Sequence, residues 1–551
     1  MTGQGQLGGQ QVYVLPEGSS RLIGRDAQRT NIAVAYAVAN TVRTTLGPRG
    51  MDKMLVSEMG DIVITNDGAT ILGEMNVEHP AAKIMVQIAK MQDKEVGDGT
   101  TTAVVLAGEL LKRSGELLDE GIHASTIIGG YNLAAEKAGQ VLNAISKPVK
   151  LADTKLLERI ASISMGSKSV GVGDHKDTLA KLVVKAVKQV AEERDGKVTV
   201  DADFIKIEKK EGGDISMTQF IDGVLIDKEI VHSGMPKRAE NAKILLLDNA
   251  LEIEKTETDA KIEISSPNQL TEFLAQEENM LKDMVEKVAK SKANVVFCQK
   301  GIDDVAQHFL SKKGIMAVRR VKKSDMEKLA KATGAMIATS FDDISEKDMG
   351  FAGSVYEKKV SGEQMVFVEK CKDPKSVTLF VRASTEHVVN EGERAVKDAV
   401  GAVSSAIEDG AYVFGGGSVE MELAQQLRKY AIEIGGRQQF AIQSFAEALE
   451  SIPRTLAEST GMDVIDTLAQ LRAKHDKPEG LSLGVDVYHS QIADMEKLGV
   501  VEPSKVKKQA ISSASEATEM ILRIDDMISA KSRPAGGMPP GGMGGMGGEM
   551  D

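Results

Sequence analysis

The sequence predicts a multidomain α+β protein in which an α/β segment is inserted into a mainly helical one. A chain of 551 residues corresponds to roughly three or four domains, at about 100–200 residues per domain. Helical periodicity runs from residue 25 to about 144 and returns after about 400, whereas short β-runs alternate with helices between about 222 and 371. This change of period at both borders of the central segment indicates a separate α/β unit.

Composition and charge exclude several classes of partner. Hydrophobic residues make up 42% of the chain, aromatic residues only 3%, and tryptophan is absent, so we expect an aliphatic core. The formal net charge of −13 repels a phosphate backbone, and we therefore expect no nucleic-acid partner. Because the sequence shows no signal peptide and no long apolar run, we expect no membrane association.

Cysteine usage points to a reducing compartment. The two cysteines, Cys298 and Cys371, lack the CxxC spacing of a zinc or redox motif. So few cysteines in a long chain are typical of a reducing environment, and the apolar neighbours of both indicate buried, unreactive thiols. We therefore expect a cytoplasmic location.

The N-terminal part is expected to be helical with one hairpin. Residues 1–20 are rich in Gly and Gln and should be loosely ordered. A helix that begins near Gln28 should end at the rigid turn 46–50. The apolar runs 54–56 and 61–65 should then pair as a small hairpin.

The turn Gly97–Thr102, with the sequence GDGTTT, is the strongest local signal in the chain. Pro80 opens a helical pattern before it, and a second pattern through Val104 and Leu111 follows, so the turn lies at a helix N-terminus. Free N–H groups and the helix dipole favour a phosphate there, and Asp98 offers the oxygen ligand that Mg²⁺ prefers. Taken alone, the motif is equally consistent with a capped helix–turn–helix.

Four more features resemble that turn in kind. They are the turn 46–50, the turn 66–68 with Asp67 after a β-run, the glycines 415–417 before a helix beginning near Val419, and Asp398 inside a helical pattern. Each has an ordinary explanation as a turn or a solvent-facing acid. Their joint occurrence favours a nucleotide site built without the Walker A pattern, which the sequence lacks.

The central segment contains five strand candidates, at residues 206–210, 224–226, 244–247, 295–297 and 316–318. Their spacing, with helical patterns between them, is typical of an α/β domain.

One stretch before the long helix that opens at Ser266-Pro267 is ambiguous. Residues 251–254 and 262–264 alternate like exposed strands and flank the polar stretch 255–261, which either projects from its domain or is an ordinary surface loop. After residue 400 the helical patterns return, and the residues 532–551, almost wholly Gly, Met and Pro, should be disordered.

The order of the turn motifs resembles the chaperonins. The segments that carry the resemblance are TLGPRGMDKML (45–55), DIVITNDGATIL (61–72), VGDGTTTAVVLAGELL (96–111) and FGGGSVEMEL (414–423). Four others are similar to the group II chaperonins, the archaeal thermosome and eukaryotic cytosolic type: RDAQRTNI (25–32), VEHPAAK (77–83), GVLIDKEIVHSGMPK (223–237) and RIDDMI (523–528). The likeness runs from Arg25 to Asp526 and is strongest to an archaeal thermosome subunit.

The resemblance implies three domains. An equatorial ATP-binding domain would comprise 1–150 and 411–551, an intermediate hinge domain 151–221 and 372–410, and an apical substrate-binding domain 222–371 with a helical lid protrusion at about 231–275. The Gly/Met tail is similar to tails that hang into a chaperonin cavity.

The resemblance also implies the activity. The protein would be an ATP-dependent chaperone that binds non-native polypeptide, encloses it in a ring cavity with its built-in lid, and promotes folding through cycles of ATP hydrolysis with Mg²⁺. Its partners would be copies of itself, with or without paralogous subunits, in two stacked rings, and no separate lid co-chaperonin. The substrate-binding residues would lie along 231–290.

The resemblance assigns a role to individual residues. Asp98 would ligate Mg²⁺, and Asp67 and Asp398 would flank the γ-phosphate and position the attacking water. Lys168 would reach the phosphates, although its run Met165-Gly-Ser-Lys168 departs from the Gly-Lys-Gly-like pattern of that site. The phosphates, ribose and base would contact Leu46, Gly47, Pro48, Gly97, Gly99, Thr100, Thr101, Thr102, Gly416, Gly417, Gly480, Leu481 and Glu502.

Two other functions fit part of the sequence. The first is a nucleotide-regulated scaffold or passive holdase without hydrolysis, but a pure binder has no use for water-positioning acids such as Asp67 and Asp398. The second is a small-molecule kinase with a non-Walker site, in which the Gly/Met tail and the projecting segment would have no role.

Overall fold

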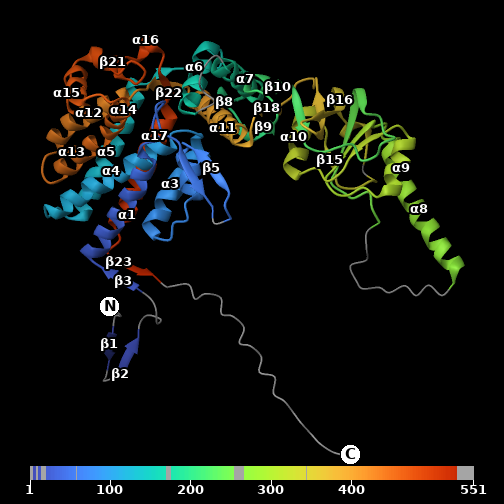
Figure 1. Ribbon diagram of the computed structural model, residues 1–551, viewed down its shortest axis with the longest axis horizontal. Helices are drawn as coiled ribbons and strands as arrows, with labels where there is room; N and C mark the ends of the chain where they lie inside the picture. Colours follow the sequence, from blue (N-terminus) through green and yellow to red (C-terminus); the bar gives the residue numbers. More distant parts are fainter. Residues whose placement is uncertain are drawn as a thin grey trace, which may run out of the picture.

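A computed structural model describes residues 4–7, 10–13, 20–57, 59–168, 175–253, 266–342 and 344–529. The chain forms three bodies in a row (Figure 1): a helical body, a middle body and a sheet body. The helical body contains both ends of the described chain, whereas the central part of the chain forms the sheet body. The predicted insertion of an α/β segment into a helical fold is therefore confirmed. The predicted disordered tail 532–551 lies outside the described residues.

The helical body is built from helices of both chain halves. They are α1 (Arg25–Arg43), α2 (Gly68–Glu74), α3 (Pro80–Val96), α4 (Thr100–Asp119), α5 (Ala124–Ile145), α12 (Ser418–Ile434), α13 (Gln438–Leu449), α14 (Ser451–Thr460), α15 (Val464–His475), α16 (Met495–Leu498) and α17 (Ser504–Leu522).

Short strand pairs accompany this body, and the pair nearest the N-terminus lies apart from the helices (Figure 1). The antiparallel pairs are β1 (Gln4–Leu7) with β2 (Gln10–Tyr13), β3 (Ser20–Ile23) with β23 (Asp526–Ser529), β4 (Lys53–Val56) with β5 (Ile62–Thr65), and β20 (Leu483–Asp486) with β21 (Gln491–Asp494). A three-stranded sheet joins β6 (Lys147–Pro148), β19 (Ala411–Phe414) and β22 (Val501–Pro503). The predicted hairpin is thus confirmed as β4–β5.

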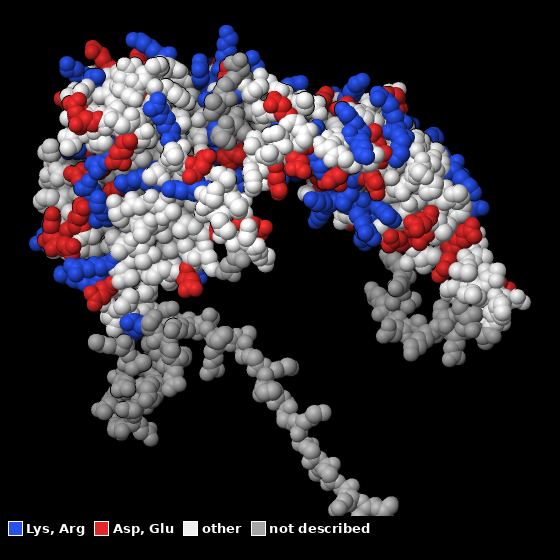
Figure 2. All heavy atoms as spheres, in the orientation of Figure 1, with Lys and Arg blue, Asp and Glu red and all other residues white. Residues whose placement is uncertain are grey.

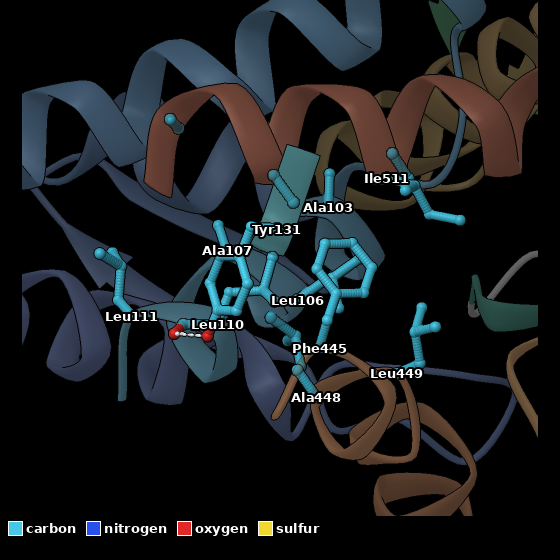
Figure 3. Packing of buried hydrophobic residues seen from close by; sticks show 14 of the residues in the cluster. Ala103, Leu106, Ala107, Leu110, Leu111, Tyr131, Phe445, Ala448, Leu449 and Ile511 are labelled. Carbon is cyan, nitrogen blue, oxygen red and sulfur yellow. Dashed lines mark hydrogen bonds between the residues drawn. The ribbon is translucent and has the colours of Figure 1, made fainter. Parts of the chain in front are cut away.

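The core of the helical body surrounds α4. Residues 103–111 of this helix are buried without interruption, because α1, α3, α13 and α17 pack on different sides of it. Tyr131 and Phe445 meet edge to face beside it, with ring centroids 5.5 Å apart (Figure 3). At Gly108 the approach of α1 is so close that a Cβ would lie 2.2 Å from the Cβ of Ala39. A helix buried on all sides is held in position firmly, and its N-terminus carries the GDGTTT turn.

The middle body is a small sheet covered by three helices. The sheet order is β10 (Gln219–Ile221), β18 (Val377–Ala383), β9 (Ile205–Glu211), with β18 and β9 parallel. The helices are α6 (Thr154–Ser164), α7 (His175–Val190) and α11 (Glu386–Asp409), and β7 (Glu192–Arg194) pairs with β8 (Lys197–Thr199).

The sheet body contains a seven-stranded mixed sheet in the order β11-β17-β16-β12-β13-β14, with β15 also paired to β12. Its strands are β11 (Gly223–Ile226), β12 (Arg238–Leu247), β13 (Val295–Cys298), β14 (Met316–Val318), β15 (Ile337–Ala338), β16 (Gly350–Val360) and β17 (Glu363–Glu369). Helices α8 (Pro267–Lys290), α9 (Asp304–Lys312) and α10 (Lys323–Thr333) connect or flank the parallel strands.

Several sequence expectations can be compared with this sheet. The five strand candidates all lie in strands, and Ser266 caps α8 as predicted. The expectation of an exposed strand at 251–254 is wrong, because Leu251 is fully buried and forms only an isolated bridge with Ile302. The second half of that expectation, with residues 255–261, falls outside the described residues.

The hairpin of β16 and β17 was not predicted. Ser361 and Gly362 connect the two strands, and both have positive φ, 52° and 97°. Two left-handed residues in succession are the geometry of the tight turns that join antiparallel strands. A Ser-Gly dipeptide is too common in loops to identify such a turn from sequence.

The surface carries charges of both signs. On the face shown in Figure 2, acidic and basic side chains are interspersed over all three bodies, and the far end of α8 is mostly uncharged. Both cysteines are buried free thiols. None of the helices in the described ranges combines the length and the apolar character needed to cross a membrane.

A buried carboxylate at the junction of α13 and α14 forms ion pairs with two other helices of the helical body. Glu450 lies at 0% exposure between α13 and α14, and it pairs with Arg428 of α12, at 2.6 Å, and with Arg472 of α15. A charge buried this deeply is stable only while its partners remain.

Glu450→Ala should lower the free energy of unfolding of the helical body by about 3 kcal/mol, because it opens a buried cavity and leaves Arg428 and Arg472 without their shared carboxylate. Glu447→Ala is the matched control: this glutamate lies one turn earlier on α13, pairs with Arg113 and is 43% exposed, so its removal should cost less than about 1 kcal/mol. Urea unfolding followed by circular dichroism measures both, because the chain has no tryptophan. Equal losses in the two variants would contradict the role of Glu450.

Candidate functional site

A cavity of about 380 Å³ opens at the junction of the helical and middle bodies. It gathers most of the residues that the sequence assigned to a nucleotide site: Leu46, Gly47, Pro48, Asp67, Asp98, Gly99, Thr100, Thr101, Thr102, Lys168, Asp398, Gly416, Gly417 and Glu502. These residues come from seven separate stretches of the chain, so the cavity exists only in the folded molecule. Gly97, Gly480 and Leu481 do not line it.

The GDG turn joins α3 to α4 through two left-handed glycines. Gly97 ends α3 with φ 70°, and Gly99 is the N-cap of α4 with φ 75°. Because a glycine N-cap has no side chain to accept hydrogen bonds, the N-terminus of α4 faces the cavity without a side-chain cap. The first N–H groups and the helix dipole therefore favour an anion at this point.

Asp98 lies between these glycines and lacks a cationic partner. Its Oδ1 accepts a hydrogen bond of 2.6 Å from the N–H of Gly99. The side-chain amide of Gln92 donates a hydrogen bond of 2.9 Å to the backbone carbonyl of Asp98. Burial raises the pKa of Asp98, although a hydrogen bond with Ser164 and the more distant charge of Lys168 act in the opposite direction. No lysine or arginine in the described ranges forms an ion pair with it. A buried carboxylate without a paired side chain is costly unless it binds a proton or a metal ion.

Three ionisable side chains meet at the cavity beside the α4 N-terminus, where the hydroxyl of Thr100 donates to Asp67 Oδ1 at 3.3 Å. The ammonium of Lys168 lies 3.7 Å from Asp67 Oδ1 and 3.4 Å from Asp398 Oδ2, and Lys168 is only 4% exposed. Burial disfavours the charge of Lys168, but the two carboxylates outweigh that effect and raise its pKa. The lysine is therefore held in its charged form between two acids from different bodies.

The two acids differ in their surroundings. Asp67 caps α2 and accepts hydrogen bonds of 2.7 Å from both the N–H and the hydroxyl of Thr70. Burial raises its pKa, but the charge of Lys168 and these hydrogen bonds outweigh burial, so the pKa lies below its usual value. Asp398 has no such donors, and burial together with the nearby acids raises its pKa well above the usual value despite Lys168. The surroundings therefore lower the pKa of one carboxyl group and raise that of the other.

Local folding explains how these side chains reach the cavity. Asp67 follows directly from the β4–β5 hairpin, and the neighbouring Asn66 donates its amide to the carbonyl of Ser167. That contact brings the turn after α6, which carries Lys168, against the hairpin. Asp398 lies in the middle of α11, which enters from the middle body.

A second ionic group at the cavity was not predicted from the sequence. Lys507 of α17 is buried and contacts Glu420 Oε1 and Glu502 Oε2, each at 2.7 Å. Burial raises the pKa of Glu502, and Lys507 opposes this shift. Nothing in the sequence marks Lys507, because it is one of several lysines in an ordinary helical pattern.

The predicted glycines divide into two groups. Gly416 and Gly417 line the cavity, but a Cβ on them would meet Met495 Sδ at 2.5 Å and Pro453 Cβ at 2.7 Å, so packing within the protein already requires them. Gly480 lies against the backbone of Lys474, away from the cavity lining, and Gly97 contacts Gly401 of α11.

Comparison with known proteins gives a consistent result. The model of the TCP-1/cpn60 chaperonin family matches residues 38–532. A thermosome subunit of Pyrococcus abyssi is 60% identical, with 96% of this chain and 95% of that protein aligned. A thermosome subunit of Desulfurococcus sp. is 58% identical, with 99% of this chain and 100% of that protein aligned.

A solved structure agrees with these sequence matches. The open state monomer of a group II chaperonin from Methanococcoides burtonii is 44% identical and matches with a TM-score of 0.58, covering 78% of this chain and 100% of that one. The resemblance carried by the turn motifs is confirmed over nearly the whole length. The chain therefore belongs to the TCP-1/cpn60 chaperonin family, and its relatives within that family include the thermosome subunits.

Proposed function

We propose that this protein is an ATP-hydrolysing chaperonin subunit that encloses non-native polypeptide. The observation that carries the proposal is the convergence of Asp67, Asp98 and Asp398 with Lys168 around the uncapped N-terminus of α4. Phosphoryl transfer to water needs charge neutralisation and in-line placement of the water more than covalent help from the protein. In this site, Lys168 and the N–H groups of α4 would neutralise charge, and the carboxylates would place the water.

The residues present fit a nucleotide with Mg²⁺. The N-terminus of α4, with Thr100, Thr101 and Thr102, would hold the β- and γ-phosphates, and Asp98 would contribute a carboxylate to the metal. No cluster of three or more metal-ligating side chains exists in the described residues. That arrangement suits Mg²⁺, which commonly takes one or two carboxylates and completes its shell with water and phosphate oxygens. The bound ion would neutralise charge on the phosphates.

The two acids beside Lys168 would act on the attacking water. Asp398, whose pKa burial raises, is suited to accept a proton as the water attacks the γ-phosphorus and ADP leaves. Asp67, whose pKa is lowered, stays ionised and would orient the same water. Lys168 keeps the two carboxylates from repelling each other and would contact the γ-phosphate.

The remaining parts of the nucleotide would occupy the rest of the cavity. Leu46, Gly47 and Pro48 would lie along the phosphates and ribose, and Gly416 and Gly417 beside the nucleoside. Glu502 would accept hydrogen bonds from the ribose hydroxyls, while Lys507 holds its other oxygen.

We also propose the domain roles. We assign the helical body to the expected equatorial domain (1–150 and 411–551), the middle body to the hinge domain (151–221 and 372–410) and the sheet body to the apical domain (222–371). Of the expected protrusion at about 231–275, β12 lies within the sheet, and the first turns of α8 extend away from it (Figure 1). Leu270, Phe273 and Leu274 are exposed there, and we assign them to contact with non-native chains or a neighbouring lid.

The names of the relatives support assembly. They are called thermosome subunits, one of them subunit beta in Thermococcus kodakarensis. We propose that this chain assembles with its own copies or with paralogues into two stacked rings in the cytoplasm, without a separate lid protein.

Asp398→Ala should reduce ATP turnover by about 10²-fold or more, since the proton acceptor and water-orienting group is lost. Nucleotide affinity should persist, because Asp98 and the α4 N-terminus remain. Steady-state phosphate release and equilibrium nucleotide binding measure the two effects. Glu393→Ala, which removes a surface acid of the same helix paired with Lys209, is the control and should leave turnover unchanged. Normal turnover in Asp398→Ala would refute the assignment.

Asp98→Asn should raise the Mg²⁺ concentration needed for half-maximal turnover by about tenfold or more, equivalent to at least about 1.4 kcal/mol of metal binding. The amide keeps the size of the side chain but removes the charge that attracts the cation. A Mg²⁺ titration of phosphate release measures this shift, with Glu95→Gln, an exposed acid three residues away, as the control. An unchanged titration curve would contradict a metal role for Asp98.

The wild-type protein should suppress aggregation of a denatured model protein and release it folded only when ATP is hydrolysed. It should also elute from a sizing column as a very large ring assembly. Suppression without ATP turnover would favour the passive holdase. A small particle that phosphorylates metabolites would favour the kinase.

A further inference from the structure

Two glycines from different bodies touch backbone to backbone beside the cavity. Gly97 ends α3 in the helical body, and Gly401 lies in the interior of α11 in the middle body. A Cβ built on Gly401 would lie 2.7 Å from the Cα of Gly97 and 2.9 Å from the carbonyl oxygen of Val96. A Cβ on Gly97 would lie 2.8 Å from the Cα of Gly401. These distances are shorter than a side chain tolerates, and the obstructing atoms are backbone.

The contact is one of three that align α11 with the end of α3. Lys397 pairs with Asp93 at 2.8 Å, and the hydroxyl of Ser405 donates to the carbonyl of Val96 at 3.3 Å. Positions 397, 401 and 405 are spaced by four residues, so they lie along one face of α11. The glycine contact is the middle of the three, and there the two backbones meet without an intervening side chain.

Local helix stability does not explain Gly401. A glycine in a helix interior costs about 1 kcal/mol relative to alanine, because it loses more backbone freedom on folding. The space that a side chain at 401 would occupy is filled by backbone atoms at the end of α3. A larger residue at 401 would therefore prevent the close approach of the two bodies.

The same two segments carry two acids of the site. Asp98 directly follows Gly97, and Asp398 precedes Gly401 by three residues, which places it on the neighbouring part of the same helix surface. A displacement of α11 from the α3–α4 turn therefore moves Asp398 away from the α4 N-terminus and from Asp67.

We infer that Gly97 and Gly401 are positioning residues, whose backbone contact lets α11 come close enough to bring Asp398 into the hydrolytic site. This inference rests on the proposed ATPase function. It gives Gly97, which does not line the cavity, a role in place of the phosphate contact expected from sequence.

Gly401→Ala tests the contact directly. Alanine favours the helix, but its methyl group forces α11 away from α3, so phosphate release at saturating ATP should fall about tenfold or more while nucleotide affinity stays unchanged. The control is Gly139→Ala in α5, another helical glycine, where a Cβ would meet nothing within 4 Å. That control should leave turnover unchanged. Circular dichroism checks that both variants fold.

Combination with Asp398→Ala separates positioning from a general structural effect. If Gly401→Ala acts by withdrawing Asp398, adding Asp398→Ala to it should lower turnover little beyond the Asp398→Ala level. Independent, multiplicative losses would overturn the inference, as would normal turnover in a folded Gly401→Ala protein.

Ser405→Ala provides a variant that adds no atoms and removes only the hydrogen bond to Val96. It should lower turnover about threefold without changing nucleotide affinity. If Gly401→Ala fails to fold, normal turnover in Ser405→Ala overturns the inference. A wild-type protein that hydrolyses no ATP would instead refute the proposed function itself, so the two failures are distinguished.

Discussion

One buried ammonium group connects the two halves of the site. Lys168 lies between Asp67 of the helical body and Asp398 of the middle body, at 3.7 and 3.4 Å. Removing a charge from water is costly, and two carboxylates within 4 Å compensate for that cost here. Without Lys168 the acids would repel each other across the cavity. The arrangement in which α11 covers the cavity is therefore favoured electrostatically by this one side chain.

Few residues along the chain separate the sheet body from the cavity. The chain enters the sheet body after β10 and returns through β18, and these two strands pair with each other. The hydroxyl of Thr378 in β18 donates to the carbonyl of Gly223 at the first residue of β11. Because α11 begins three residues after β18 ends, only Ser384 and Thr385 separate this strand pair from the helix that carries Asp398. The sheet body and the cavity wall are thus joined by a short covalent path.

The turn motifs predicted residues that mostly line one cavity, and the sequence predictions failed where packing decides. Thr100–Thr102, Asp67 and Asp98 lie in the cavity wall, because a turn's conformation depends on its own glycines and caps. Gly97 has the same left-handed conformation as Gly99, yet it faces α11 and not the cavity. Leu251 alternates with polar residues like an exposed strand residue but is fully buried, since Ile302 and its neighbours cover it. Lys507 is indistinguishable in sequence from surface lysines, and only its contacts with Glu420 and Glu502 reveal it.

The sequence by itself determined the elements and the chemistry of the turns. The period of apolar residues, the proline and glycine positions and the capping residues are local properties, and local sequence specifies them. Only the tertiary structure decided which carboxyl group has a lowered pKa and which a raised one, because that depends on burial, hydrogen bonds and nearby charges. It also decided that α11 passes backbone to backbone beside α3. Contacts between residues some 300 positions apart follow from how whole helices pack, which no local pattern records.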